Sequence, residues 1–190
     1  HIEDSRIIPS RFLSKMLNDA IKGNPFFFYV LSQATSVAQI VETAVDSATY
    51  GGKRTIIIKG GAGTGKSVVA INALGQLLNN NESGHRLNAV YVTSNAAPRT
   101  LYTEELVAND YKKTVIGALF RYPTVFCRAG EDEFDCSLID EAHRIFDFKG
   151  GVGIRKGTHV LDDIIRASRV AVFFIDDDQA VTTTDFATID

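Results

Sequence analysis

A glycine-rich segment between an apolar run and an amphipathic stretch constrains the fold of this chain more than any other feature. The segment Gly60-Gly61-Ala62-Gly63-Thr64-Gly65-Lys66-Ser67 matches the pattern G-x-x-x-x-G-K-[ST]. It follows the β-branched run 55–58 and precedes apolar residues at helical spacing over 68–78. Glycines let successive N–H groups surround phosphate oxygens, and a helix start adds a positive dipole end. The segment predicts a phosphate-binding loop (Walker A), with Lys66 on the β- and γ-phosphates and Ser67 as a Mg²⁺ ligand.

From residue 53 onward, segments with strand character alternate with segments of helical periodicity. Strands are expected over 55–58, 89–93, 137–140 and 170–175. The run 55–58 is continuous and β-branched, which is typical of a strand buried on both faces in a parallel sheet. Helices are expected over 68–78, around 99–106 and around 160–167, and a mixture of helix and loop over 108–134. This alternation predicts a three-layer α/β domain with a mostly parallel sheet, in which strand 170–175 lies between strands 55–58 and 137–140.

The first 52 residues read as an N-terminal helical segment. Apolar residues recur on one helical face from Phe12 to Ile21, and Gly23 to Pro25 end that pattern. After an apolar run over 26–31, Ser32 is predicted to cap a second helix that carries apolar residues up to Val45. We therefore divide the chain into a helical segment, 1–52, and an α/β domain, 53–190.

Two adjacent carboxylates follow the strand at 137–140. Asp140 and Glu141 stand at the end of the run Cys136-Ser137-Leu138-Ile139. Because ligands of a parallel sheet gather at the carboxyl ends of its strands, Asp140 is predicted to face the loop and hold Mg²⁺ (Walker B). Glu141 is then placed to polarise a water for in-line attack on the γ-phosphate. The alternative is an Asp-Glu helix N-terminus, which the helix dipole favours.

A third polar strand end follows the apolar run 172–175. Three successive aspartates, Asp176 to Asp178, repel one another unless they are solvated or lie near a cation. Gln179 is uncharged, both donates and accepts hydrogen bonds, and is predicted to sense the γ-phosphate. The alternative is a solvated acidic turn.

Composition excludes several other classes of protein. The formal net charge is −3, which does not indicate wholesale electrostatic capture of nucleic acid or of an anionic membrane. No apolar run approaches the ~18 residues that span a bilayer, and charged residues at the start argue against a signal peptide. The only cysteines, Cys127 and Cys136, fit neither a disulfide framework nor a zinc spacing. We expect a cytoplasmic protein with reduced cysteines.

These motifs together resemble the superfamily 1 helicase motor, and more closely the Schlafen group 3 helicase-like domain of bacterial proteins. The residues that carry the resemblance are the loop 60–67, the stretch Ile139 to Arg144 and the stretch Phe173 to Gln179. The resemblance implies a RecA-like P-loop NTPase lobe that binds ATP and Mg²⁺. It also implies contacts between single-stranded nucleic acid and the segment 93–99, with Thr93, Asn95 and Arg99 as candidates, and it implies that Gln33 reads adenine.

One departure from that family concerns length. Superfamily 1 motors have two RecA-like lobes, and the second supplies arginines typically worth roughly 10³–10⁵ in rate. The chain has room for the first lobe only, and because it begins at His1 we expect a fragment of a longer protein. The isolated chain is therefore expected to bind nucleotide and to hydrolyse it very slowly.

The resemblance implies ATP hydrolysis coupled to translocation on, or remodelling of, DNA or RNA. Lys66, Glu141 and Gln179 are the expected catalytic residues, and Ser67 and Asp140 the expected metal ligands. One alternative is an NTP-binding regulatory or defence-signalling module that does not unwind nucleic acid. A second is a P-loop kinase, although kinases of that type usually lack an Asp-Glu pair at a strand end.

Overall fold

A parallel β-sheet forms the centre of the molecule. The structure, a computed structural model, describes residues 15–22, 31–80, 84, 86–145 and 160–176. Within these residues the sheet has five strands in the order β1-β5-β4-β2-β3, and every neighbouring pair is parallel. The strands are β1 (Arg54–Lys59), β2 (Ala89–Val92), β3 (Phe120–Arg121), β4 (Phe134–Ile139) and β5 (Ser168–Ile175). The predicted α/β architecture is confirmed, and so is the position of β5 between β1 and β4.

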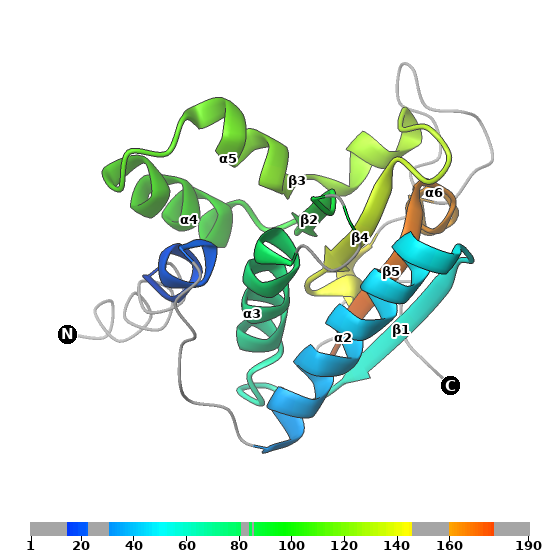
Figure 1. Cartoon of the computed structure of the whole chain (residues 1–190). Helices are drawn as coiled ribbons and strands as arrows, with labels where there is room; N and C mark the ends of the chain where they lie inside the picture. The colour runs from blue at the N-terminus through cyan, green and yellow to red at the C-terminus, as the bar shows by residue number, and fades with distance from the viewer. Residues whose placement is uncertain (1–14, 23–30, 81–83, 85, 146–159, 177–190) are drawn as a thin grey trace.

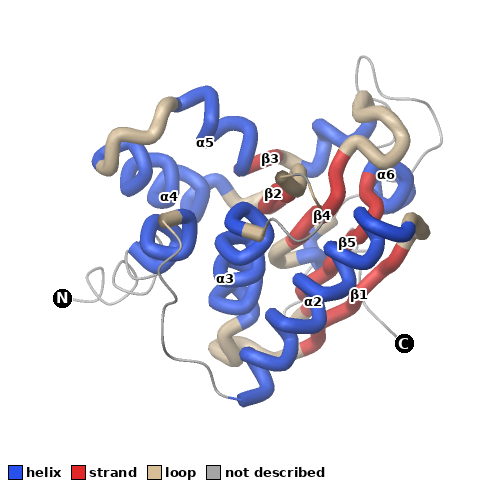
Figure 2. Tube along the Cα trace, viewed as in Figure 1, coloured by secondary structure: helices blue, strands red, loops and turns tan. Residues whose placement is uncertain are grey.

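Helices cover both faces of this sheet, which gives the three layers (Figures 1 and 2). One core cluster contains side chains of α2, α3, α4 and α5, and the other contains side chains of α6 and of the short 3₁₀ helices η1 and η2. The helices are α2 (Leu31–Tyr50), α3 (Lys66–Asn79), α4 (Ala96–Ala108), α5 (Lys113–Leu119), α6 (Val160–Ala167), η1 (Pro123–Cys127) and η2 (Ala142–Arg144).

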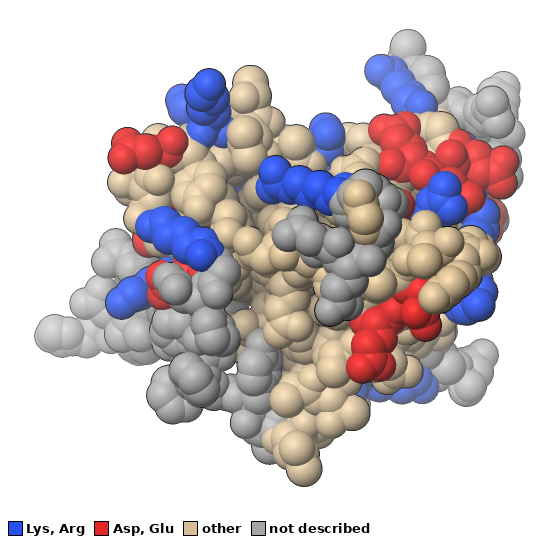
Figure 3. Space-filling model, in the orientation of Figure 1, with Lys and Arg blue, Asp and Glu red and all other residues tan. Residues whose placement is uncertain are grey.

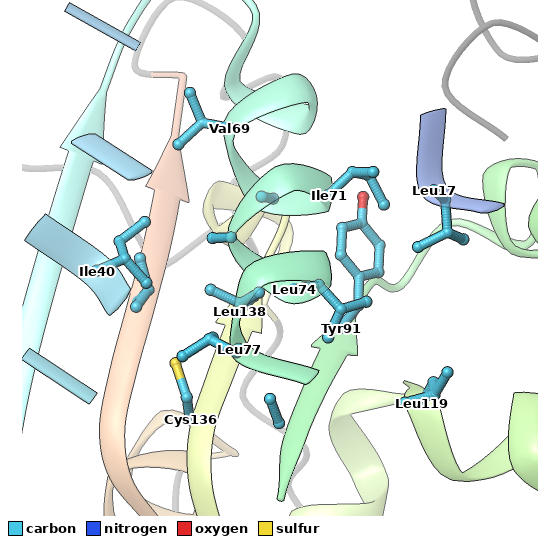
Figure 4. Close-up of a cluster of buried hydrophobic side chains, with 14 of the residues drawn as sticks. Leu17, Ile40, Val69, Ile71, Leu74, Leu77, Tyr91, Leu119, Cys136 and Leu138 are labelled. Atoms are coloured by element: carbon cyan, nitrogen blue, oxygen red, sulfur yellow. The ribbon is translucent and has the colours of Figure 1, made fainter. Parts of the chain in front are cut away.

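Alternate residues of each central strand enter opposite core clusters. In β2, Tyr91 belongs to the cluster under α3, whereas Val90 and Val92 belong to the cluster under α6. Figure 4 shows the first cluster, in which the Tyr91 ring lies beside Ile71 and Leu74 of α3. This alternation follows from the period of two in a strand, and burial on both faces accompanies continuous apolar runs in β2 and over 170–175 of β5.

The strand that precedes the loop departs from the prediction. We expected β1 to be buried on both faces, but its burial alternates between exposed and half-buried residues, and Ile57 is 51% exposed. Among the described strands β1 pairs only with β5, so it lies at the edge of the sheet. Ile56 and Ile58 pack into the core cluster that contains α2, while no other described strand residue of β1 belongs to either core cluster. A β-branched run therefore indicated a strand correctly and its burial wrongly.

The N-terminal helices pack on the same sheet. Residues 15–21 are helical, and Met16 and Leu17 are buried in the cluster that also contains Ile40 and Ala44 of α2. The helix α2 begins at Leu31, so Ser32 lies in its first turn and the predicted cap is wrong. The start of the first helix and most of the apolar run 26–31 lie outside the described residues. Division of the chain at residue 52 stays a prediction.

The stretch 108–134 contains the mixture of helix and loop that its sequence indicated. It contains α5, the two-residue strand β3 and η1. Cys127 at the end of η1 is a half-buried free thiol, and Cys136 on β4 is a buried one. Burial raises the pKa of both thiols. Within the part of the chain that the structure describes, no helix is long and apolar enough to cross a membrane.

Candidate functional site: a phosphate-binding loop at the carboxyl edge of the sheet

The glycine-rich loop connects the end of β1 to the start of α3. Gly65 precedes α3 with φ 86°, and Gly63 has φ 76°, both in the left-handed region that L side chains avoid. A turn closes the loop, since the Thr64 amide and hydroxyl donate to the Gly61 carbonyl at 3.4 and 2.9 Å. The first amides of α3 therefore lie beside the loop, as an anion site at a helix start requires.

Lys66 is half-buried and folds back over the loop. Its ammonium donates to the carbonyls of Gly60 and Gly61, the latter at 2.8 Å. It also lies 3.3 Å from Asp176 Oδ2, and its side chain is 13% exposed. The lysine that the sequence assigned to phosphates is therefore at the loop, in contact with acceptors of the protein itself.

Ser67 and Asp140 come together although they are far apart in the sequence. The Ser67 hydroxyl donates to Asp140 Oδ2 at 2.8 Å. Asp140 follows β4 directly, and the Asp140 amide donates to the Val92 carbonyl at 2.9 Å, which extends the β2–β4 ladder by one residue. The predicted metal-side pair is thus adjacent, and the loop and the acidic strand end share one edge of the sheet.

The oxygens of this pair suit a hard divalent cation. A hydroxyl and a nearly buried carboxylate, with Asp140 only 7% exposed, are the oxygen ligands that Mg²⁺ prefers. The described residues contain no cluster of three His, Cys, Asp or Glu side chains that could hold a metal. This donor set fits Mg²⁺, which usually takes one or two protein ligands and completes its shell with water and substrate phosphates.

Tyr91 is a neighbour of Asp140 that the sequence analysis missed. Its ring is buried in the sheet, and its hydroxyl donates to the same Asp140 oxygen that accepts from Ser67. Burial, followed by the negative charge of Asp140, raises the pKa of Tyr91 well above its usual value. Tyr102 of α4 packs edge-on against this ring at 5.8 Å between centroids. An isolated tyrosine in an apolar strand carries no sequence signal for such a contact.

Glu141 has a strained backbone at the carboxyl end of β4. Its φ of 51° and ψ of 45° lie in the left-handed region, and its amide donates to Asp140 Oδ1 at 3.0 Å. One of its carboxylate oxygens, Oε2, is buried, has no hydrogen-bond partner among the residues that the structure describes, and lies 3.7 Å from Arg144 Nε. Glu141 therefore stands directly beside the metal-side carboxylate, where the sequence expected a water-activating base.

Asp176, at the end of β5, is a second carboxylate that the assignment of site residues omitted. It is 2% exposed, its Oδ2 faces Lys66, and its amide donates to His143 Nδ1 at 3.4 Å. His143 thereby links η2, which follows Glu141, to the end of β5. The sequence did contain a signal for Asp176, because three successive aspartates favour a nearby cation.

The two predicted glutamines have different outcomes. Gln33 of α2 donates to the Thr64 carbonyl at 2.8 Å, so the structure brings it to the loop. A Cβ added at Gly65 would lie 2.3 Å from the Gln33 amide nitrogen, which shows how closely the two approach. Gln179 lies outside the described residues.

The segment expected to contact nucleic acid leads into α4. Thr93 is buried, and its hydroxyl accepts from the Asn95 amide at 3.2 Å. The Asn95 side chain caps α4 by accepting from the Ala97 amide at 3.1 Å. The Arg99 guanidinium lies 3.6 Å from the centre of the Tyr122 ring, in a cation–π contact. Lys and Arg form separated groups on the face in Figure 3, interspersed with Asp and Glu.

Comparison with known families identifies the α/β part of the chain. Residues 53–190 match the family described as Schlafen group 3, DNA/RNA helicase domain. No curated protein and no solved structure matches the chain. The matched range includes the loop, Asp140 and Asp176, and it begins one residue before β1.

Proposed function

The chain belongs to the Schlafen group 3 DNA/RNA helicase domain family, and from that premise we propose that it binds ATP with Mg²⁺ and hydrolyses it to drive translocation on, or remodelling of, DNA or RNA. A helicase-like domain of this family implies nucleotide-dependent action on nucleic acid in general. The choice of ATP, the hydrolysis step and the coupled movement are the parts that we add.

One observation carries this proposal. The Ser67 hydroxyl lies 2.8 Å from Asp140 Oδ2, and Lys66 immediately precedes Ser67 at the start of α3. A phosphate-binding lysine, a hydroxyl and a carboxylate therefore occupy one edge of a parallel sheet, where ligands of such sheets bind. A triphosphate on the loop would have its β- and γ-phosphates beside all three groups.

Each residue has a chemical task in the proposed reaction. The loop amides and Lys66 bind the phosphates and neutralise charge that develops during transfer. Ser67 and Asp140 hold Mg²⁺, which when bound supplies Lewis-acid stabilisation of the phosphoryl oxygens. Glu141 orients and deprotonates the attacking water, with Arg144 as a nearby countercharge.

Three further assignments complete the proposal. Gln33 contacts the adenine side, since it already lies at the loop beside Gly65. Gln179 senses the γ-phosphate. Thr93, Asn95 and Arg99 contribute to a path for single-stranded nucleic acid, with an exposed face formed by the start of α4 and Tyr122.

Steady-state ATP hydrolysis tests the reaction. Lys66→Ala should reduce Mg²⁺-dependent turnover by roughly 10²–10³-fold, the cost of removing one charge-stabilising donor. Lys15→Ala removes an exposed lysine outside the loop and should leave turnover unchanged. We also propose slow turnover by the chain alone, because the arginine of a second lobe would be missing. A rate above about 1 s⁻¹, in the range of complete enzymes, would contradict that statement.

The alternative is an NTP-binding regulatory module without unwinding activity. It is favoured by the intramolecular contacts of the nucleic-acid candidates, because Thr93 is buried and Arg99 is engaged by Tyr122. Stimulation of ATP hydrolysis by single-stranded DNA or RNA would support the motor. Equal hydrolysis across all nucleic acids tested, with no binding to any of them, would support the regulatory module.

A further inference from the structure

Asp176 is the most deeply buried carboxylate among the described residues, and nothing in the proposed reaction requires it. It is 2% exposed, and its Oδ1 is buried with no hydrogen-bond partner in the described part of the chain. A buried charge without compensation is costly, so natural structures keep such groups paired. The single cation beside it that the structure describes is Lys66, 3.3 Å from Oδ2.

Strand register places Asp176 beside the loop. In the β1–β5 ladder Lys59 pairs with Ile175, so the next residues, Gly60 and Asp176, leave the sheet side by side. The Gly60 amide still donates to the Ile175 carbonyl at 3.3 Å, which holds the start of the loop against the end of β5. The fold therefore fixes Asp176 at the place where Lys66 returns over the loop.

All three N–H donors of the Lys66 ammonium have acceptors within the protein. An ammonium group has three N–H donors and no acceptor. Lys66 uses them on the Gly60 carbonyl, on the Gly61 carbonyl at 2.8 Å and on Asp176 at 3.3 Å. A phosphate oxygen can therefore gain a hydrogen bond from Lys66 only if one of these three acceptors is released.

We infer that Asp176 is a positioning residue that holds Lys66 in the nucleotide-free protein and competes with the β- and γ-phosphates for it. The inference rests on the proposed binding of a nucleoside triphosphate at the loop. When phosphate arrives, Lys66 exchanges a carboxylate for phosphate oxygens of greater charge. Asp176 thus lowers nucleotide affinity and keeps the lysine ordered when the loop is empty.

Substitution of Asp176 by asparagine separates this role from a purely structural one. Asp176→Asn keeps the size of the side chain and an amide oxygen that accepts from Lys66, but removes the competing charge. The dissociation constant of MgATP, measured by calorimetry on the whole chain, should fall by roughly five- to tenfold. Inorganic triphosphate should show the same gain, and adenosine should show none, because only phosphate competes with Asp176.

A second lysine–aspartate pair gives the matched control. Lys53, just before β1, pairs with Asp132, which has a φ of 53° that asparagine tolerates well. Asp132→Asn breaks an ion pair of the same type at the other end of β1 and should leave MgATP affinity unchanged. Thermal unfolding of each variant verifies that it is folded.

A second measurement, of ammonium proton exchange by NMR, uses the wild-type chain and does not depend on the folding of any variant. In the ¹⁵N-lysine-labelled wild-type chain without nucleotide, three hydrogen bonds should slow exchange of the Lys66 ammonium protons enough to give an observable NMR signal. Inorganic triphosphate should shift that signal. A Lys66 ammonium that exchanges as rapidly as the exposed Lys112 would overturn the inference.

The affinity outcomes distinguish the inference from the function on which it rests. Tighter binding by Asp176→Asn with an unchanged Asp132→Asn supports the inference. Equal or weaker binding by Asp176→Asn, with clear binding by the wild type, overturns the inference and leaves nucleotide binding intact. Absence of binding by the wild type and by both variants overturns the proposed function and the inference with it.

Discussion

Removal of the Tyr91 hydroxyl should lower the unfolding free energy and leave the Asp140 carboxylate less firmly oriented for Mg²⁺. Tyr91→Phe keeps the buried ring and deletes the hydrogen bond to Asp140. A hydrogen bond to a charged group contributes about 1.5–3 kcal/mol, and Asp140 at 7% exposure has little access to replacement water. We expect the unfolding free energy to fall by about 2 kcal/mol and the Tm by about 4–8 °C.

The same substitution should reduce the contribution of Mg²⁺ to nucleotide binding. Asp140 would keep its bonds from Ser67 at 2.8 Å and from the Glu141 amide at 3.0 Å, but its orientation would be less restricted. The ratio of ATP dissociation constants in EDTA and in Mg²⁺ should therefore fall several-fold. Affinity in EDTA should change little, because the Tyr91 hydroxyl donates to Asp140 on the metal side of the site, whereas Lys66 binds the phosphates.

Tyr102→Phe is the matched control for this prediction. It removes a hydroxyl from the neighbouring buried ring, which is edge-on to Tyr91 and stacked on Phe120. That hydroxyl is hydrogen-bonded to the uncharged Tyr91 hydroxyl, and no hydrogen bond from it to Asp140 is seen among the described residues. It should cost less than about 1 kcal/mol and leave the Mg²⁺ ratio unchanged. Urea unfolding and calorimetry give both readouts. Wild-type stability and a wild-type Mg²⁺ ratio in Tyr91→Phe would refute the reasoning.

Alkaline titration gives a further check on Tyr91. Because burial and Asp140 raise its pKa above the ordinary value of 10.0, the tyrosine stays protonated in the folded chain while the unfolded chain ionises. Its stabilising contribution is therefore complete below pH 10 and is lost as the pH rises above that value. Above pH 10, the unfolding free energy of the wild type should fall with pH more steeply than that of Tyr91→Phe, by about 1.4 kcal/mol for each pH unit.

Three glycine substitutions give two further predictions, each measured by urea unfolding. Gly65→Ala should destabilise the chain more than Gly63→Ala. Both glycines have positive φ, but only a Cβ at residue 65 would displace the Gln33 amide. The difference between the two should vanish in a Gln33→Ala background. Gly75→Ala should cost about 1–3 kcal/mol, because the new Cβ would lie 2.3 Å from the Ala20 Cβ and 3.1 Å from its backbone, which outweighs the helix propensity of alanine. An increase in stability would contradict the Gly75 prediction.

The fold was largely predictable because its signals are local. The loop pattern, the alternation of strands with helices and the polar strand ends each occupy a few consecutive residues. The edge position of β1 was not predictable from the run 55–58, because β-branched residues record strand preference and the cover of each face depends on distant helices. The cap at Ser32 was wrong because Ser32 already lies inside the helix, which begins at Leu31 rather than at residue 33.

The candidate site was predictable in part. Lys66, Ser67 and Asp140 belong to recognisable patterns, and a parallel sheet brings such strand ends to one edge. Tyr91 was missed because an apolar strand gives no indication which aromatic hydroxyl meets a carboxylate 49 residues later. Asp176 was noted as one of three acids, but only the register of β5 against β1 singles it out as the partner of Lys66.

The left-handed backbone of Glu141 makes folding stability and the proposed catalytic role compete at one position. A glutamate at φ 51° costs about 1–2 kcal/mol that glycine would not. A glycine at this turn would therefore give a more stable protein that lacks the proposed base. A gain in stability at position 141 is thus obtained only with a loss of the proposed turnover.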